Sequence, residues 1–309
     1  MLSYENKARE PCYTVRTARG LTVNYRAFYT AVCTVEAKSL VIYCLHSRGQ
    51  PGRNTMAVIA VFNQKGGVGK TTTALNVSAG LSMLNLDPIA IDLDPQGHLT
   101  LASGAPAIAP QAGAFGFFQN GIAFEKVVHR LASGRRIVPA TLDLSKIDAL
   151  RGGEANISTR LRDGIRDGTA GSSAPIIIDC CPMLGVLTLN ALIAANRVLI
   201  PVSADFLSLQ GVERLDRALN ALEIKLKRRI ERRVLVTRYD GRRKLSSEIY
   251  AELKRRYGDV VCETRIVENV ALAESPMHGK DIYAFAPSSP GARDYAALMR
   301  ELGGSGFFS

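Results

Sequence analysis

Short apolar runs of five or six residues alternate with longer stretches of helical spacing from residue 56 onward. Uninterrupted apolar runs between turn residues are typical of strands buried in a parallel sheet. We predict such strands at residues 57–62, 88–93, 136–140, 175–180, 197–202 and 234–239. Strands that alternate with helices predict an α/β fold of three layers, in which helices flank a mostly parallel central sheet.

The helices are predicted from apolar residues that recur every three or four positions. They cover residues 72–84, 122–131, 188–192, 209–226 and 292–302. In the longest helix, a stripe of apolar side chains is expected to face the core: Leu209, Val212, Leu215, Leu219, Leu222 and Leu226.

Residues 1–55 differ from this pattern. They hold half of the tyrosines and half of the cysteines and show no clear period, and residues 48–54 (RGQPGRN) indicate a break. We predict one domain over residues 56–309, preceded by an extension over residues 1–55. The extension is either a disordered, poorly packed appendage or upstream sequence included by a wrongly chosen start codon. Met56, directly before the first predicted strand, favours the second hypothesis, which an intact mass of the native protein would test.

Composition narrows the class of protein. Hydrophobic residues make up 47% of the 309 residues and charged residues 22%, as in globular chains. No apolar stretch reaches the roughly 18 residues of a membrane-spanning helix, and the first residues lack the pattern of a secretion signal. The six cysteines form no C-x-x-C pair, so the sequence does not support a zinc ribbon or a thioredoxin-type redox site. Reduced thiols in a cytoplasmic protein are expected.

A glycine-rich loop lies between the first predicted strand and the first predicted helix, at residues 63–72 (NQKGGVGKTT). Backbone N–H groups of such a loop, together with the helix dipole, form a cradle for phosphates. Lys70 is expected to reach the β- and γ-phosphates, and the Thr71 hydroxyl to hold Mg²⁺. The predicted nucleotide-binding residues of this P-loop are Gly66, Gly67, Val68, Gly69, Lys70, Thr71 and Thr72. Gln64 stands where the generic pattern has its first glycine, and a second lysine, Lys65, follows.

Carboxylates end two of the predicted strands. Asp92 and Asp94 lie in the stretch DLDPQG, which begins at the end of the second strand, and Asp179 ends the run PIIID. Acids at strand ends beside a phosphate cradle are suited to holding Mg²⁺ and to positioning water. Alternatively, Asp94 before Pro95 simply opens a turn.

The loop at residues 63–72 resembles the deviant Walker A motif of the ParA/MinD class of P-loop ATPases. The stretch DLDPQG resembles the switch I motif of this class, and the run PIIID resembles its Walker B strand. The resemblance implies a P-loop NTPase fold in which Asp94 positions or activates the attacking water. It implies that Asp92 supports the metal shell and that Asp179 holds the water shell of Mg²⁺. Lys65 would reach the phosphates of a second subunit, so Lys65, Lys70 and Asp94 are the implied catalytic residues. Cys181 replaces a proline usual in the family, and adjacent Cys180 and Cys181 are interpreted as buried, inert thiols.

The segment 270–280 (VALAESPMHGK) resembles the family's segment near the nucleotide base, which implies a nucleotide-binding role for the preceding Asn269. Just before it, Glu268 stands where relatives usually carry an arginine. The family pattern D-x-R-x-x-L is matched by Asp240, Arg242 and Leu245, and it implies a non-specific DNA contact for Arg242.

A basic run supports this DNA prediction. Residues 225–244 hold ten Lys/Arg and two acids in a chain of formal net charge +11. Clustered basic residues are typical of surfaces that bind the DNA backbone, although charge runs are more often simply solvated. The predicted DNA-binding residues are Arg238, Arg242, Arg243 and Lys244.

The resemblance implies a ParA/Soj-type partitioning ATPase, cytoplasmic, nucleoid-associated and prokaryotic, with ATP and Mg²⁺ as cofactors. An ATP-bound homodimer would bind DNA non-specifically, and a centromere-binding ParB-like protein or another cargo adaptor would stimulate hydrolysis and release it. A MinD-like membrane ATPase is one alternative, but residues 305–309 are too short for an amphipathic membrane helix, so no membrane partner is expected. A cargo-positioning or regulatory ATPase that does not segregate DNA is another alternative, and a small-molecule kinase is a third. The sequence does not identify the cargo.

Overall fold

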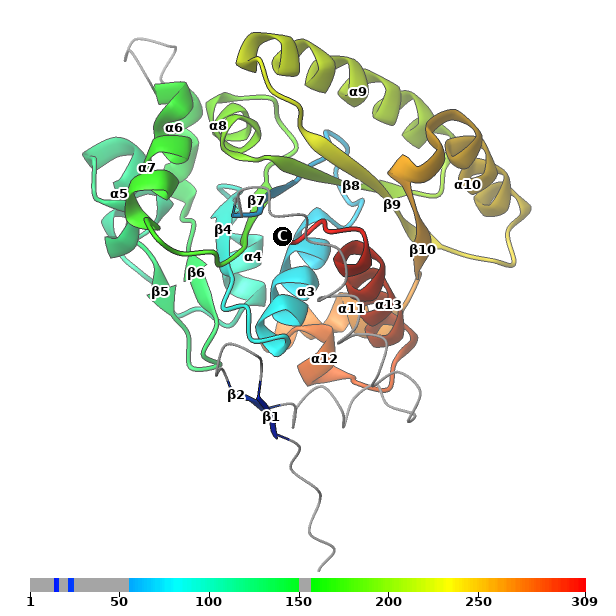
Figure 1. Cartoon of the computed structure of the whole chain (residues 1–309), viewed down its shortest axis with the longest axis horizontal. Coiled ribbons are helices and arrows are strands. Elements are labelled where there is room, and N and C mark those ends of the chain that lie inside the picture. Colours follow the sequence, from blue (N-terminus) through cyan, green and yellow to red (C-terminus); the bar gives the residue numbers. More distant parts are fainter. Residues whose placement is uncertain (1–13, 17–21, 25–55, 150–156) are drawn as a thin grey trace, which may run out of the picture.

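An eight-stranded sheet forms the centre of the computed structural model, which describes residues 14–16, 22–24, 56–149 and 157–309 (Figure 1). Its strands are β3 (Val58–Val61), β4 (Ile89–Leu93), β5 (His129–Arg130), β6 (Arg136–Val138), β7 (Ile176–Cys180), β8 (Arg197–Ser203), β9 (Glu231–Tyr239) and β10 (Val261–Val267). They lie in the order β10-β9-β8-β3-β7-β4-β6-β5, and every neighbouring pair is parallel except β5 and β6. The predicted mostly parallel sheet is confirmed.

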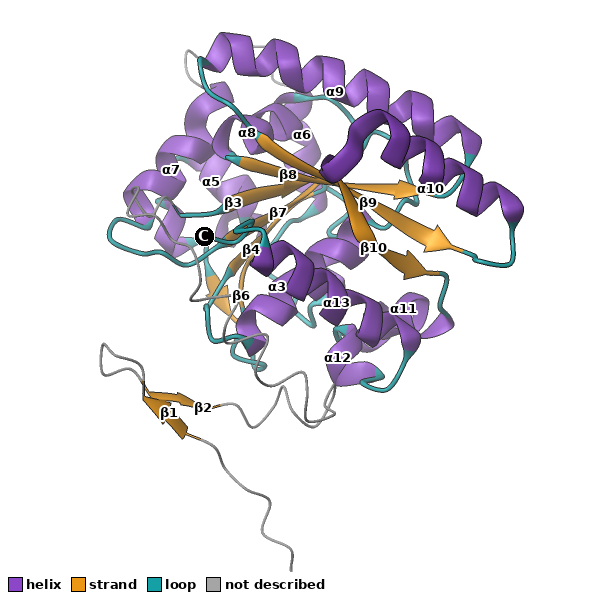
Figure 2. Ribbon diagram, turned by 45° about the vertical axis from the view of Figure 1, so that its right-hand side comes forward, coloured by secondary structure: helices purple, strands orange, loops and turns teal. Residues whose placement is uncertain are grey.

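Helices cover both faces of the sheet (Figure 2). They are α3 (Lys70–Met83), α4 (His98–Ala102), α5 (Ala114–Asn120), α6 (Ser145–Ala149), α7 (Arg160–Gly168), α8 (Val186–Ala194), α9 (Phe206–Leu226), α10 (Lys244–Tyr257), α11 (Val270–Glu274), α12 (Ile282–Phe285) and α13 (Pro290–Gly304). None of the helices in the described ranges is both long and apolar enough to cross a membrane.

Side chains that point alternately to the two faces of the central strand, β3, contribute to two separate cores. Val58 and Ala60 of β3 pack in one core with residues of α8 and α9, whereas Ile59 and Val61 pack in the other with residues of α3 and α13. Successive side chains of a strand point to opposite faces, so a strand covered on both sides must be apolar throughout. The stripe predicted on residues 209–226 also faces a core, because its members are buried or half-buried in α9.

One predicted helix is wrong. Residues 122–131 form a short 3-10 helix, Phe124–Lys126, followed by strand β5. The burial of Phe124, Val127 and Leu131 imitates a helical period. However, the backbone of β5 pairs with β6 across a turn in which Gly134 has φ +82°. Pairing at the sheet edge outweighs local helix propensity here.

Strands β1 (Thr14–Arg16) and β2 (Thr22–Asn24) form a separate antiparallel pair. The rest of residues 1–55 lies outside the described residues, so the interpretation of this extension stays a prediction.

Acidic side chains of α13 cover the edge strand β10. Glu301 accepts hydrogen bonds from the N–H groups of Glu263 at 2.7 Å and Thr264 at 2.8 Å, and Asp294 accepts from that of Val267 at 2.9 Å. Unpaired N–H groups on an edge strand would otherwise offer a template for another chain.

We expect Glu301→Ala to lower the free energy of unfolding by about 2 kcal/mol, because two backbone donors lose a charged acceptor. Chemical denaturation measures the change, with Glu274→Ala, at an exposed position of α11, as the control. A Glu301→Ala protein as stable as the control would contradict this role.

Candidate nucleotide-binding and catalytic site

The glycine loop joins β3, in the middle of the sheet, to the N-terminus of α3. Gly67 and Gly69 have φ of +73° and +83°, a left-handed conformation that side chains with a Cβ rarely adopt. Gly69 is the N-cap of α3 and no side chain caps this helix. The first N–H groups of α3 therefore keep their hydrogen-bonding capacity for an anion, and the helix dipole favours negative charge at the same place.

Two side-chain hydrogen bonds with distant parts of the chain hold this loop in place. Asn63 accepts from the N–H of Lys65 at 3.0 Å and donates to the carbonyl of Pro201 at 2.8 Å. The Thr237 hydroxyl donates to the carbonyl of Val68 at 2.8 Å. The loop is thus hydrogen-bonded to strands β8 and β9, so these strands position the cradle without a ligand.

Lys70 lies inside this cradle with only 8% of its surface exposed. Its Nζ donates to the carbonyl of Lys65 at 3.0 Å. Burial lowers the pKa of Lys70, while the nearby charges of Asp179 and Asp94 act in the opposite direction. A buried cation that is held at the start of a helix is well placed for phosphate oxygens.

Asp179 ends β7 beside the loop. Both of its carboxylate oxygens are buried, and neither makes a hydrogen bond of regular geometry with the described residues. Burial first, and then the charge of Asp92, raise the pKa of Asp179 well above its usual range, although the nearby Thr71 hydroxyl and Lys70 act against this rise. A buried carboxylate without a hydrogen-bond partner is costly, so the position of Asp179 suits the binding of a cation.

Asp92 and Asp94 have different surroundings. Asp92 is fully buried, which raises its pKa to about 6, and both of its oxygens accept hydrogen bonds from residues 94 and 100. Asp94 lines a cavity of about 710 Å³ that opens beside the loop. Its Oδ1 accepts from the N–H of Gln96 at 3.0 Å. Asp94 is therefore the acid of this pair that lines the cavity, and the roles of both acids stay predictions.

The donor set fits Mg²⁺. Mg²⁺ keeps several waters and is usually bound by one or two carboxylates together with substrate phosphates. The structure offers the buried carboxylate of Asp179 near the hydroxyl of Thr71, which lines the cavity beside the glycine loop. Its described ranges hold no group of three or more His, Cys, Asp or Glu that would bind a metal by itself. Asp179 and Thr71 would hold the ion, which would balance phosphate charge.

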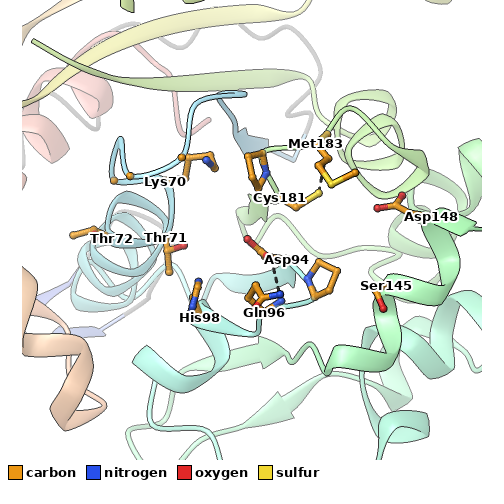
Figure 3. Close-up of a pocket in the computed structure, with 15 residues that line it drawn as sticks. Lys70, Thr71, Thr72, Asp94, Gln96, His98, Ser145, Asp148, Cys181 and Met183 are labelled. Atoms are coloured by element: carbon orange, nitrogen blue, oxygen red, sulfur yellow. Dashed lines mark hydrogen bonds between the residues drawn. The ribbon is translucent and has the colours of Figure 1, made fainter. Parts of the chain in front are cut away.

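Several residues that line the cavity in Figure 3 were not predicted as site residues from the sequence. His98, Ser145, Asp148, Cys181 and Met183 line the same cavity as Lys70, Thr71 and Asp94. Ser145 and Asp148 come from α6, about 50 residues after the switch I stretch, and only folding brings them there. Asp148 also accepts from the N–H of Leu187 at 3.1 Å, at the start of α8.

A second cleft, of about 560 Å³, lies on the other side of the loop. It shares Gly67, Gly69 and Thr72 with the first cavity, and Asn269 and Arg238 are among its other lining residues. The side chain of Asn269 accepts from the N–H of Ala271 at 2.9 Å and caps α11. A nucleotide with its phosphates on the loop would have room for its base in this cleft, which Asn269 lines.

Known proteins are similar to this chain in sequence. A family model described as "AAA domain" matches residues 56–232. The chain is 41% identical to the chromosome-partitioning ATPase Soj of Thermus thermophilus, over 79% of this chain and 94% of that protein. It is 33% identical to the chromosome partitioning protein ParA of Caulobacter vibrioides, over 81% and 94%. The chain belongs to the Soj/ParA family of P-loop ATPases.

A solved structure extends the comparison. Cobyrinic acid a,c-diamide synthase from Mycobacterium smegmatis, with bound ADP and magnesium, is 28% identical and superposes with a TM-score of 0.68. The match covers 79% of this chain and 93% of that one. The P-loop ATPase fold predicted from the motifs is confirmed.

In this Soj/ParA-family chain, Lys65 is engaged within its own subunit. Its Nζ forms an ion pair with Asp205 and donates to Ser203 Oγ at 3.2 Å. Asp205 also caps α9 by accepting from the N–H of Ser208. Lys65 does not line the cavity that holds Lys70, so any contact with phosphates requires it to leave Asp205.

The two cysteines of the Walker B strand are buried, as predicted. Burial raises the pKa of both thiols, so neither is a reactive thiolate near neutral pH.

Strand β9 divides the basic run of this family member into two groups. Lys225, Lys227, Arg228 and Arg229 precede the strand, and Arg232 and Arg233 lie near its start. The predicted DNA-binding residues lie at its other end, with Arg238 in the strand and the rest after it. The nine residues of β9 separate the groups by roughly 30 Å, at about 3.3 Å per residue.

The predicted DNA-binding residues themselves differ in their surroundings. Arg242 and Lys244 each expose 91% of their side chains. Arg242 and Arg243 pair with Asp240, and Lys244 pairs with Glu248. Arg238 instead lines the cleft of Asn269 and pairs with Glu268 at 3.1 Å. Glu268 thus pairs with one of the four predicted basic residues, as Asp240 and Glu248 pair with the other three.

Proposed function

We propose that the chain is an Mg²⁺-dependent ATPase that dimerises with ATP, binds DNA non-specifically as the dimer and acts in chromosome or plasmid partitioning. The observation that carries the proposal is the buried, unpartnered carboxylate of Asp179 beside Lys70 and the uncapped start of α3. This charge pattern is typical of a site for a nucleoside triphosphate with its Mg²⁺ ion. Membership of the Soj/ParA family supports partitioning as the biological role.

Exposed apolar side chains near the cavity support dimerisation. Met183 and Leu184 follow β7, and Phe206 and Leu207 begin α9 after β8. Their exposed fractions lie between 54% and 68%. Because β7 and β8 flank β3, these side chains all lie at the carboxyl edge of the sheet, on the side of the nucleotide cavity. Large apolar side chains grouped on a surface are typical of a protein interface.

Lys65 gives this interface a role in catalysis. In the proposed dimer it leaves Asp205 and reaches the phosphates of the partner subunit, as a cation supplied in trans. The exposed group of Arg242, Arg243 and Lys244 supplies the contact with DNA phosphates. A ParB-like or other cargo adaptor would stimulate hydrolysis, and the cytoplasm, at the nucleoid, would be the site of action.

The buried tail disfavours a membrane-bound alternative. Phe307 is fully buried and Phe308 is 8% exposed, and both pack in the core that contains α13. These aromatic side chains are therefore not available as the apolar face of a membrane-binding segment.

DNA binding that depends on ATP tests the proposal. We expect Lys65→Ala and Arg242→Ala each to abolish the DNA retention that wild-type protein shows with ATP, and retention to weaken steeply with salt because bound phosphates release counterions. Sedimentation with ATP distinguishes the two variants, since only Lys65→Ala should lose the dimer. Arg217→Ala, at an exposed position of α9, is the control. Equal DNA binding with and without ATP would contradict the proposed switch.

A further inference from the structure

Thr100 bonds the loop that carries Asp94 back to the strand from which it leaves. The Thr100 hydroxyl donates to Oδ2 of Asp92 at 2.7 Å, and its backbone N–H donates to the same oxygen at 2.8 Å. The other oxygen of Asp92 accepts from the N–H of Asp94 at 3.1 Å. Asp92, near the end of β4, therefore holds both Asp94, at the start of the loop, and Thr100, in the first turn of α4.

The same hydroxyl attaches the loop to a second strand. It accepts from the N–H of Ala140 at 2.9 Å, and Ala140 follows β6, the neighbour of β4. The loop lies close to this point, because a Cβ added at Gly97 would stand 3.4 Å from the Ala140 carbonyl oxygen. A hydroxyl donates one hydrogen bond and still accepts others, so one oxygen atom joins Asp92, the loop and the end of β6.

We propose that Thr100 is a positioning residue for Asp94, acting through Asp92 and Ala140 without contacting the nucleotide. Thr100 is absent from the residues that line the cavity, whereas Asp94 is among them. A group that positions an attacking water must be held to a fraction of an ångström, and the partners that orient it share its importance for the rate. This role rests on the proposed ATPase function.

Thr100→Val tests the role, because valine keeps the shape of threonine and removes the hydroxyl. We expect kcat to fall about 10- to 100-fold, KM for ATP to stay nearly unchanged, and amides of residues 94–100 to exchange faster with solvent. Thr100→Ser, which keeps the hydroxyl, should restore most of the rate. Thr141→Val is a matched control, since the buried Thr141 hydroxyl makes no hydrogen bond within the described structure.

A double-mutant cycle separates this role from a general loss of stability. In the Asp94→Ala background, Thr100→Val should cause no further loss of turnover, because the group that it positions is gone. A full additional loss would overturn the proposal, as would unchanged kcat and amide exchange in Thr100→Val. If valine prevents folding, Thr100→Ala is compared with Thr100→Ser in the same assays. Wild-type protein that hydrolyses no ATP would overturn the proposed function itself, whereas hydrolysis that is insensitive to Thr100→Val overturns only the role of Thr100.

Discussion

Asp94→Ala is expected to bind ATP and to hydrolyse it about 10²- to 10⁴-fold more slowly than the wild-type protein. The phosphates are proposed to bind to the loop, Lys70 and Thr71, and the substitution leaves all of these in place. Asp94 instead lines the open part of the cavity, where a water would attack the terminal phosphate. Equilibrium binding of ATP and single-turnover hydrolysis measure the two effects separately, and unchanged turnover would refute the assignment of Asp94.

Asp94→Asn is the matched control for this prediction. Asparagine keeps the side-chain oxygen that accepts from the N–H of Gln96, so the local turn is preserved while the charge is removed. If Asp94 acts as a base or orients water by its charge, the asparagine variant should be as slow as the alanine variant. A fast asparagine variant would show that Asp94 serves only the shape of the loop.

Asp179→Asn is expected to abolish most Mg²⁺-dependent hydrolysis, by about 100-fold or more, and yet to stabilise the nucleotide-free protein near neutral pH. The first effect follows from the loss of the carboxylate that is proposed to hold the metal shell. The second follows because the variant no longer buries a carboxylate without a partner. A gain in stability that accompanies a loss of function is typical of a strained site.

The stabilisation of the nucleotide-free protein by Asp179→Asn should increase as pH rises. Burial and the charge of Asp92 raise the pKa of Asp179 in the folded protein. Between the usual aspartate range, about pH 4, and this raised pKa, the folded state holds a proton that the unfolded state has lost. Wild-type stability therefore falls as pH rises through this window, and that of Asp179→Asn does not fall for this reason.

Chemical denaturation at pH 5 and pH 8, without nucleotide or metal, measures this difference. The stability of Asp179→Asn relative to the wild-type protein should be greater at pH 8. Asp259→Asn, at an exposed position, is the control and should show no such change with pH. A relative stability of Asp179→Asn that is equal at the two pH values would contradict the assignment of a costly buried charge to Asp179.

Local pattern predicted the six inner strands of the sheet and neither of its two edge strands, β5 and β10. The continuous apolar runs of β3, β7 and β8 predicted buried parallel strands because both faces of each strand must be covered. The interval 122–131 was predicted wrongly, because three apolar residues at helical spacing say nothing about a neighbouring strand that offers hydrogen bonds. Strand β5 exists only because the chain turns at Gly134 and pairs with β6.

The chemistry of the site was predicted from the sequence. Glycines before Lys70 and Thr71, and acids after two apolar runs, predict a phosphate cradle with a metal because spacing along one segment controls that local geometry. Tertiary structure alone decided which partners these side chains have. It showed that the Asp179 carboxylate has no hydrogen bond of regular geometry among the described residues and that Lys65 is held by Asp205. It also showed that Asp92 bonds the segment after Asp94 through Thr100, and that β9 divides the basic run. Lys65 and Asp205 are 140 residues apart in the chain, and Thr100 and its second partner Ala140 are 40 apart, so these contacts depend on the order in which strands pair.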